Sequence, residues 1–163
     1  MTTPTAPGLT PIQPDTRQGQ LTLNGVSMCI GAWCVSNVMC LWEDADQRGT
    51  DRIIPGVAGV LSYPRRPTET TKSMSIVIAG AVDHTGTPFS DPFVGLETNF
   101  AYLTANVTQP VATGAGTVPG VLTMPSGATR SAAVHVGPLR IDQQGGPIIV
   151  AKFELQIPSG AFT

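Results

Sequence analysis

Half of the charge in this chain lies in one stretch, residues 43–72. Those 30 residues hold ten of the 20 formal charges in 163 residues, and charged residues make up only 12% of the whole chain. That fraction is about half of the usual share in soluble domains. A solvated monomer normally carries more charge for solubility. The shortage predicts that partners, including copies of the chain itself, cover much of the remaining surface.

An apolar island lies inside the charged stretch. Residues 53–61 read IIPGVAGVL and are broken by one proline and two glycines. Pro55 lacks a backbone donor and biases Ile54 toward an extended shape, so a central strand is not expected here. We interpret the stretch as a long charged loop that contacts another subunit. The predicted interface residues are Arg48, Gly49, Asp51, Arg52, Ile53, Ile54, Pro55, Gly56, Val57, Arg65 and Arg66.

The length predicts one folded domain, residues 21–163, preceded by an extended N-terminal arm, residues 1–20. The arm contains four prolines and few apolar groups, so it cannot bury enough surface to fold alone. It is either a plain tail or a segment that orders on a neighbour. A formal net charge of −2 gives no general attraction to nucleic acid or to an anionic membrane. We expect no signal peptide and no membrane span.

The three cysteines lie within twelve residues. Cys29, Cys34 and Cys40 make an odd set whose spacing matches neither a disulfide framework nor a zinc pattern. We therefore expect all three thiols to be reduced and packed in a reducing compartment.

Alternating residues predict a mainly β fold. Asn24-Gly25 separates two alternating runs and predicts a two-residue hairpin turn, because both positions need a positive φ. In residues 148–157 the apolar side chains alternate with Lys152 and Glu154, which predicts one buried face and one face that is exposed to solvent or paired. The other predicted strands are residues 32–35, 38–42 (after a break at Asn37), 70–82, 121–124 and 129–136, with turns at 125–127 and 143–147.

One helix is predicted after Asp91, which supplies an N-cap, with Pro92 at the first helical position. An apolar stripe then recurs every three or four residues and should pack on a sheet. Its members are Phe93, Leu96, Phe100, Leu103 and Val107. The predicted fold is a β-sandwich or rolled sheet with one flanking helix and a long charged loop.

No constellation of catalytic residues is present in the sequence. His84 and His135 are the only histidines, and neither has a nucleophile or metal ligand at a suitable spacing. The glycine-rich residues 114–120 precede a strand and contain a proline, so they cannot open a helix around a phosphate. We expect no enzyme activity, no cofactor and no metal.

With these residues in view, the chain resembles the tail tube and distal tail proteins of long-tailed bacteriophages. The matching segments are LNGV (23–26), AWCV (32–35), RGTDRIIPG (48–56) and Arg65-Arg66. In that family a similar loop follows the third strand, one helix follows the fourth, and three strands close the domain. The resemblance covers nearly all of the chain.

The resemblance implies a structural virion protein. Six copies would join their sheets edge to edge into a ring with an inner β-barrel, and rings would stack into the tail tube that conducts DNA. The implied partners are further copies, the tape measure protein, and tail-tip or terminator proteins. DNA would pass without specific binding, and no membrane is involved. The implied location is the virion tail, after assembly in the cytoplasm of the bacterial host.

Two alternatives stay open beside the tube subunit. Distal tail proteins usually carry a further domain, and this sequence ends soon after its last predicted strand, which favours a tube subunit over a distal or minor tail hub. A receptor- or glycan-binding β-sandwich would favour aromatic residues in exposed loops. Trp33 and Trp42, the two tryptophans, lie in predicted strands instead.

Overall fold

The computed structural model describes residues 9–13, 16–43, 47–48, 52–53, 60–61, 66–108 and 116–163. Its main element is an antiparallel sheet of eight strands in the order β2-β1-β9-β10-β12-β8-β3, with β11 beside β12. The strands are β1 Gln20–Leu23, β2 Val26–Ser27, β3 Trp33–Ser36, β8 Thr70–Ala79, β9 Val118–Thr123, β10 Thr129–Val136, β11 Arg140–Gly145 and β12 Ile148–Ile157.

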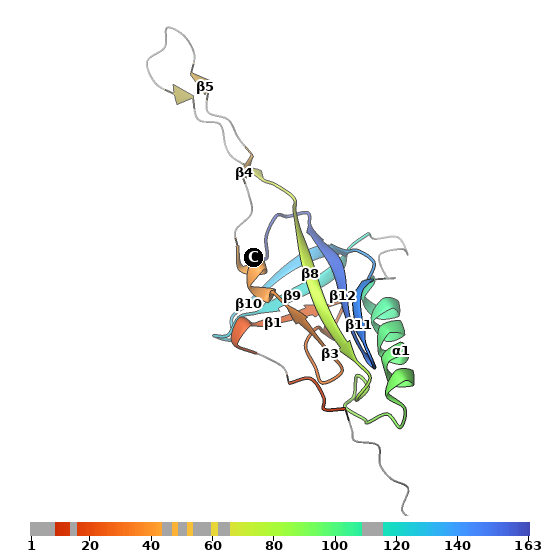
Figure 1. Cartoon of the computed structure of the whole chain (residues 1–163). Helices are drawn as coiled ribbons and strands as arrows, with labels where there is room; N and C mark the ends of the chain where they lie inside the picture. Colours follow the sequence, from red (N-terminus) through yellow and green to blue (C-terminus); the bar gives the residue numbers. More distant parts are fainter. Residues whose placement is uncertain are drawn as a thin grey trace, which may run out of the picture.

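The sheet curls into two layers around one core. β10 joins β12 through only two residue pairs, His135 with Gln156 and Val136 with Leu155. Beyond that junction β9 and β10 cross behind β8 and β12, and α1 stands beside β11 (Figure 1). The predicted fold class, a mainly β rolled sandwich with one flanking helix, is confirmed.

The two longest strands form the centre of the molecule. β8 and β12 pair over ten residues each, from Ile148 opposite Ala79 to Ile157 opposite Thr70. Their inward side chains alternate as the sequence predicts. The buried members are Met74, Ile76, Ile78 and Ala79 on β8 and Ile149, Ala151, Phe153, Leu155 and Ile157 on β12.

The helix α1 spans Pro92–Leu103 and continues as one π-helical segment, Thr104–Thr108. The Asp91 side chain caps it by accepting from the Phe93 amide at 2.9 Å, as predicted. Leu96, Leu103 and Val107 of the predicted stripe are buried. The prediction that Phe93 lies in the core is wrong: it is 56% exposed, because the buried face of α1 runs through Gly95, Leu96, Asn99 and Leu103 and Phe93 lies to one side of it.

Two glycines and one buried amide hold α1 against the end of β8. A Cβ on Gly80 would lie 1.7 Å from the Pro92 carbonyl oxygen, and a Cβ on Gly95 would lie 2.5 Å from the Gly80 oxygen. The Asn99 amide is 1% exposed and donates to the carbonyls of Ala79 and Val82, both at 2.8 Å. Backbone therefore packs directly on backbone at this junction.

Both predicted hairpin turns are confirmed. Asn24 and Gly25 have φ values of 50° and 78° between β1 and β2, as a two-residue turn requires. Gly127 has a φ of 86° between the paired strands β9 and β10. In the N-terminal arm, the Ile12 amide donates to the Gly31 carbonyl at 2.9 Å.

Two local predictions are wrong. Residues Val38–Trp42 form a 3₁₀ helix, not a strand: Asn37 turns the chain at a φ of 65°, and Val38 and Leu41, three apart, both face the core. The turn predicted over residues 143–147 begins later. Residues Gln143–Gly145 belong to β11 and pair with Val150–Ile148.

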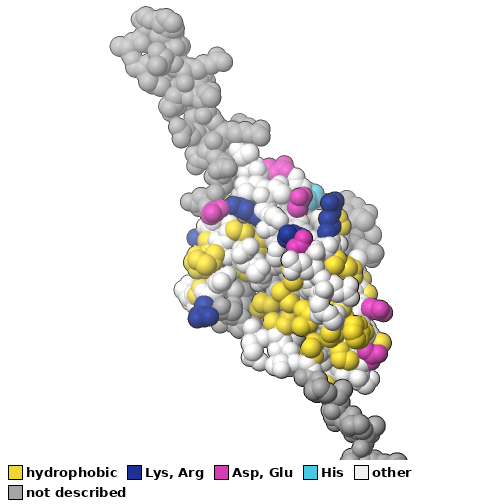
Figure 2. Space-filling view, viewed as in Figure 1, with side chains coloured by type: hydrophobic (Ala, Val, Ile, Leu, Met, Phe, Trp, Pro, Cys, Tyr) yellow, Lys and Arg dark blue, Asp and Glu magenta, His cyan; other side chains and the backbone are white. Residues whose placement is uncertain are grey.

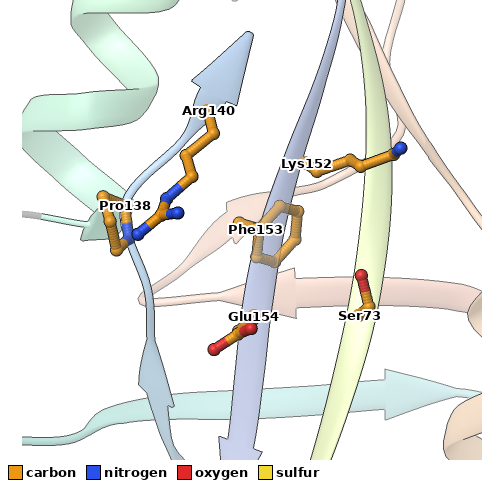
Figure 3. Close-up of a pocket in the computed structure, with 6 residues that line it drawn as sticks. All are labelled: Ser73, Pro138, Arg140, Lys152, Phe153 and Glu154. Carbon is orange, nitrogen blue, oxygen red and sulfur yellow. The ribbon is translucent and has the colours of Figure 1, made fainter. Parts of the chain in front are cut away.

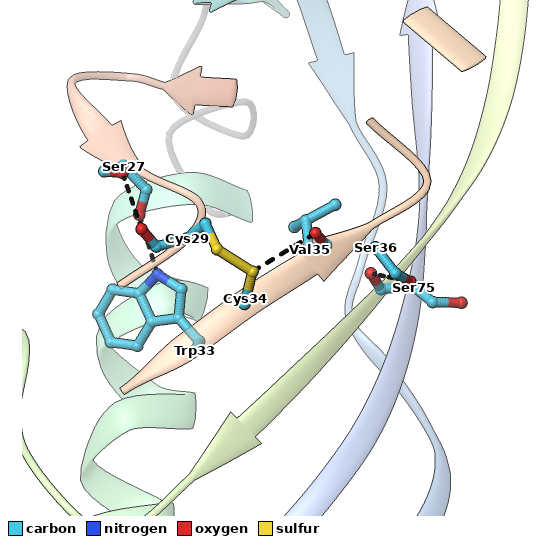
Figure 4. The surroundings of a disulfide bond; sticks show 7 residues. All are labelled: Ser27, Cys29, Trp33, Cys34, Val35, Ser36 and Ser75. Atoms are coloured by element: carbon cyan, nitrogen blue, oxygen red, sulfur yellow. Dashed lines mark hydrogen bonds between the residues drawn. A yellow bond between two sulfur atoms is a disulfide. The ribbon is translucent and has the colours of Figure 1, made fainter. Parts of the chain in front are cut away.

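The prediction of three reduced cysteines is also wrong. Cys29 and Cys34 form a disulfide, and Cys40 is free (Figure 4). The chain reverses just before β3, where the Ile30 amide donates to the Trp33 carbonyl at 2.7 Å. That reversal lays residues 28–30 along the outer edge of β3 and brings the two sulfurs together. Spacing along the sequence does not reveal such a reversal.

Candidate subunit interface

We use the name β-ribbon for residues 47–67, in which the described residues form two antiparallel strand pairs. The outer pair joins β4 (Gln47–Arg48) to β7 (Arg66–Pro67), and the inner pair joins β5 (Arg52–Ile53) to β6 (Val60–Leu61). Neither pair belongs to the main sheet. β4 and β5 lie beyond the end of β8 that begins at Thr70 (Figure 1).

Four of the eleven predicted interface residues lie in the described strands of this β-ribbon. Arg48 is in β4, Arg52 and Ile53 are in β5, and Arg66 is in β7. The remaining seven fall outside the described residues. These are Gly49, Asp51, Ile54, Pro55, Gly56, Val57 and Arg65. Their interface role stays a prediction.

The β-ribbon is basic, whereas the rest of the chain is acidic. Residues 47–67 contain four arginines and one aspartate, which gives them a formal charge of +3. Because the whole chain has a formal net charge of −2, the other residues sum to −5. The register places Arg48 opposite Arg66. The charged stretch as a whole, residues 43–72, contains five cationic and five anionic residues and is formally neutral.

The base of the β-ribbon contains unsatisfied polar atoms. The Trp42 indole nitrogen and the Thr68 hydroxyl are buried without a hydrogen-bond partner. Nearby, Lys72 on β8 pairs with Glu43, and burial raises the pKa of the Cys40 thiol. A buried donor without a partner destabilises a fold by about 1–3 kcal/mol.

The sheet has one long open edge in the described part of the chain. All six residues of β11 are exposed, and the strand pairs only with β12. The outer edge of β3 is less available for pairing with another strand, because the Val35 amide already donates to the Met28 carbonyl at 2.8 Å and the disulfide closes this edge. β2 is only two residues long. The sequence assigned half of β11 to a turn and so missed this edge.

The helix-start patch is an exposed apolar surface where α1 begins. It comprises Pro88, Phe89, Pro92, Phe93 and Val94. Phe93 and Val94 are 56% and 53% exposed. Apolar side chains gather at the lower right of the molecule, where α1 begins, with acidic side chains beside them (Figure 2). The sequence missed this patch, because periodicity alone placed Phe93 in the core.

The outer face of the main sheet carries a small hollow of about 210 Å³. Ser73, Pro138, Arg140, Lys152, Phe153 and Glu154 line it (Figure 3). Its charges are mixed, and Lys152 pairs with Asp142 at 3.0 Å. The volume lies below the usual range of small-molecule sites, about 300–1,000 Å³. This hollow therefore offers little to a ligand.

Across the described residues, no group of three or more His, Cys, Asp or Glu side chains could hold a metal ion. No helix there is long and apolar enough to cross a membrane. Trp33 is fully buried, and Trp42 is partly buried in the 3₁₀ helix. Neither tryptophan is presented in an exposed loop.

The chain matches no protein-family model, and no curated protein matches it significantly. Its fold is similar to the crystal structure of the SPP1 Dit (gp 19.1) protein, described as a paradigm of the hub adsorption apparatus in phages that infect Gram-positive bacteria. The TM-score is 0.52 at 10% identity, over 87% of this chain and 50% of that protein. The chain thus spans about half of that protein's length and shares its fold with a phage tail protein.

Proposed function

We propose that this chain is a structural protein of a phage tail that assembles with further copies of itself into rings. The observation that carries the proposal is the fold shared with a tail hub protein over 87% of the chain. The scarcity of charge on the body and the basic β-ribbon support self-assembly. The site of action is the virion tail, after assembly in the bacterial host.

The open edge of β11 supports ring formation. Exposed strand edges are a liability unless they are paired or protected. Pairing of β11 with a strand of a neighbouring copy would satisfy its free backbone groups and extend the sheet around a ring. The tube proposal has three further parts. Each ring contains six copies, the rings stack into a tube that conducts DNA, and the tube contacts tape measure, tail-tip or terminator proteins.

A tail-tip hub is the second candidate. The similar solved structure is a hub protein, and this chain corresponds to about half of it. A hub would form one ring or a pair of rings, whereas a tube subunit would stack without limit. Electron microscopy of the purified protein separates the two: long tubes support the tube subunit, single or paired rings support the hub, and monomers at every concentration contradict both.

The role of the β-ribbon is tested by charge reversal. Arg52→Glu should block assembly and leave the fold intact, because it reverses the charge of a strand outside the main sheet. Removing one partner of a desolvated interfacial ion pair costs about 2–5 kcal/mol. Sedimentation measures assembly, and far-UV circular dichroism with thermal melting measures the fold. Arg52→Lys keeps the charge and serves as the control.

Ile54→Asp places a charge in the apolar island and should have the same effect as Arg52→Glu. Full assembly by both variants would exclude the β-ribbon as a joint.

A further inference from the structure

We propose that Cys29 and Cys34 form a redox site that closes and opens the rolled sheet, and that small thiols reach this site through Cys34. The co-reactants are small thiols and their disulfides, such as the two forms of glutathione. The time at which the bond closes rests on the proposed function, in which the protein is assembled inside a bacterial host and later leaves it. The site itself does not depend on that function.

The segment that follows β2 joins the two ends of the sheet. β2 and β3 stand at opposite ends of the strand order. The Met28 amide donates to the Leu21 carbonyl of β1, and the Met28 carbonyl accepts from the Val35 amide of β3, both at 2.8 Å. Cys29 lies opposite Cys34 in an antiparallel bridge. We call this contact between the segment and β3 the seam, and the disulfide is a covalent link across it (Figure 4).

The seam is short beside the other contacts of the sheet. The Ile30 amide donates to the Trp33 carbonyl at 2.7 Å, and the Trp33 indole nitrogen donates to the Ser27 carbonyl at 3.0 Å. β8 and β12, in contrast, pair over ten residues each. Short strand contacts open locally at a lower free energy than long ones. Loss of the covalent link therefore affects the seam before it affects the rest of the sheet.

The disulfide lines a hollow of about 330 Å³. That volume falls within the usual range of small-molecule sites, about 300–1,000 Å³. The lining also includes Ile12, Gln18 and Gly19 on the N-terminal side of the sheet, and the described lining residues are all uncharged. A small thiol can therefore approach the sulfurs while the chain stays folded.

The two cysteines differ in exposure. Cys29 is 9% exposed, whereas Cys34 is half-buried on the outer side of β3. Thiol–disulfide exchange depends on which sulfur the attacking thiolate can reach. The difference makes Cys34 the sulfur that bonds to a small thiol. Cys29 is then the leaving group on reduction and the attacking thiol when the bond closes again.

The exchange balances in both directions. On oxidation, the Cys34 thiolate attacks a small disulfide, forms a mixed disulfide and releases one small thiol. The Cys29 thiolate then attacks the Cys34 sulfur, closes the bond and releases the second small thiol. Two cysteine thiols lose two hydrogens, and one small disulfide gains them as two thiols. Reduction follows the same steps in reverse.

The compartment sets the direction of the exchange. Glutathione and thioredoxin keep thiols reduced in a cytoplasm, whereas disulfides persist outside it. On the proposed function, the chain folds and assembles with both thiols reduced, and the bond closes after release from the host. A closed bond restricts the unfolded chain, so the released protein gains stability without any new contact between copies.

Single-cysteine variants test the order of attack. In a Cys40→Ser background, Cys29→Ser leaves only Cys34, and Cys34→Ser leaves only Cys29. Both folded proteins are treated with oxidised glutathione and followed by intact mass. The variant that retains Cys34 should gain one glutathione about tenfold faster, because access controls the rate. In denaturant the two rates should become equal. Equal rates in the folded proteins, with folding verified by circular dichroism, would overturn the assignment of Cys34.

Hydrogen exchange of the wild-type chain tests the seam without any substitution. The amides of Ile30 and Val35 should exchange about tenfold faster in the reduced protein than in the oxidised one, because reduction favours local opening. The paired amides of β8 and β12 are the internal control and should not change. Equal protection of the seam amides in both redox states would overturn the inference that the bond controls the seam.

Thiol trapping in intact bacteria tests the time of closing. Cells that make the protein are quenched with acid and treated with N-ethylmaleimide before lysis. Both cysteines should be alkylated, whereas protein released into oxidised glutathione should have neither alkylated. A bond already closed inside the cells would overturn the timing and leave the proposed function standing. Monomers at every concentration, with the expected exchange rates, would overturn the proposed function and support the redox site.

Discussion

In the body of the molecule, β8 and β12 pair over ten residues, whereas the described strand pairs of the β-ribbon are two residues long. The inward side chains of β8 and β12 are buried in one core. The β-ribbon pairs stand outside the main sheet. Isolated two-stranded pairs are at best marginally stable in water. The body is thus specified by contacts within one chain, and on the proposed function the β-ribbon gains its contacts from another copy.

Charge divides the two regions in the same way. The body carries few charges on its surface, and its described ion pairs, Lys72 with Glu43 and Lys152 with Asp142, involve exposed carboxylates. Exposed pairs contribute about 0–1 kcal/mol. The β-ribbon instead concentrates arginines around an apolar island. On the proposed function, packing within the chain constrains the body, and a partner surface constrains the β-ribbon.

The largest expected effect on the body comes from Gly80→Ala. The added Cβ would lie 1.7 Å from the Pro92 oxygen and 2.7 Å from the Leu96 nitrogen, both backbone atoms. Only a shift of α1 can relieve this overlap, so we expect a loss of about 3 kcal/mol or more in the free energy of unfolding. Urea denaturation measures it.

Gly145→Ala is the matched control for that substitution. A Cβ at Gly145 meets nothing within 4 Å, so the change should stay within about 0.5 kcal/mol. Equal stability of the two variants would mean that α1 does not pack on the end of β8 as described.

Asn99→Leu should cost about 2–3 kcal/mol. The substitution keeps the size of the side chain but leaves the carbonyls of Ala79 and Val82 without their donor. Thermal melting monitored by circular dichroism measures the loss. Thr98→Ala, one residue along on the exposed face, removes only a bond to the Val94 carbonyl in the same helix and should change little. A stabilising Asn99→Leu would contradict the role given to the amide.

Reduction of the Cys29–Cys34 disulfide should cost about 2 kcal/mol, the loop-closure value for a ring of this size. The oxidised protein should have a mass two hydrogens below the reduced protein. Its melting temperature should fall when reductant is added. A Cys29→Ser, Cys34→Ser double variant should not respond to reductant. Equal masses with and without reductant would show that the bond does not form.

Local sequence signals predicted the parts of the fold that depend on neighbouring residues. Asn24-Gly25 needs only its own backbone conformation, and the Asp91 cap needs only the next two residues. The alternation in β12 matched its full length, Ile148–Ile157. In each case the side chains and the backbone they organise lie within one element, so a single sequence contains the information.

Features that depend on distant residues were missed. Asn99 is polar on a buried helix face, and its partners lie 17 and 20 residues away. The disulfide depends on a reversal before β3, and the exposure of Phe93 depends on which face of α1 packs on Gly80. The charged loop was predicted as a surface feature, but its strand pairs join residues 7 to 20 positions apart across a proline and two glycines.

Shortening the β-ribbon should have the smallest effect on the stability of the body. It also tests most directly whether the body folds independently of the β-ribbon. Arg48 and Arg66 are opposed, so an Asn-Gly turn in place of residues 49–65 can close the outer pair as a two-residue hairpin. The removed strands pair only with each other, so the free energy of unfolding should change by less than about 0.5 kcal/mol. A shorter connection also lowers the entropy cost of closing the loop.

Assembly should respond in the opposite way to this shortening. Sedimentation should show that stacked assemblies are lost, because the apolar segment that reaches a second copy is gone. A fall in melting temperature of more than about 5 °C, which corresponds to about 1–2 kcal/mol in a domain of this size, would show that the β-ribbon packs on its own body. Unchanged stability with unchanged stacking would show that neither the fold of the body nor the assembly requires the β-ribbon. Only unchanged stability with lost assembly fits a β-ribbon whose contacts lie in another copy.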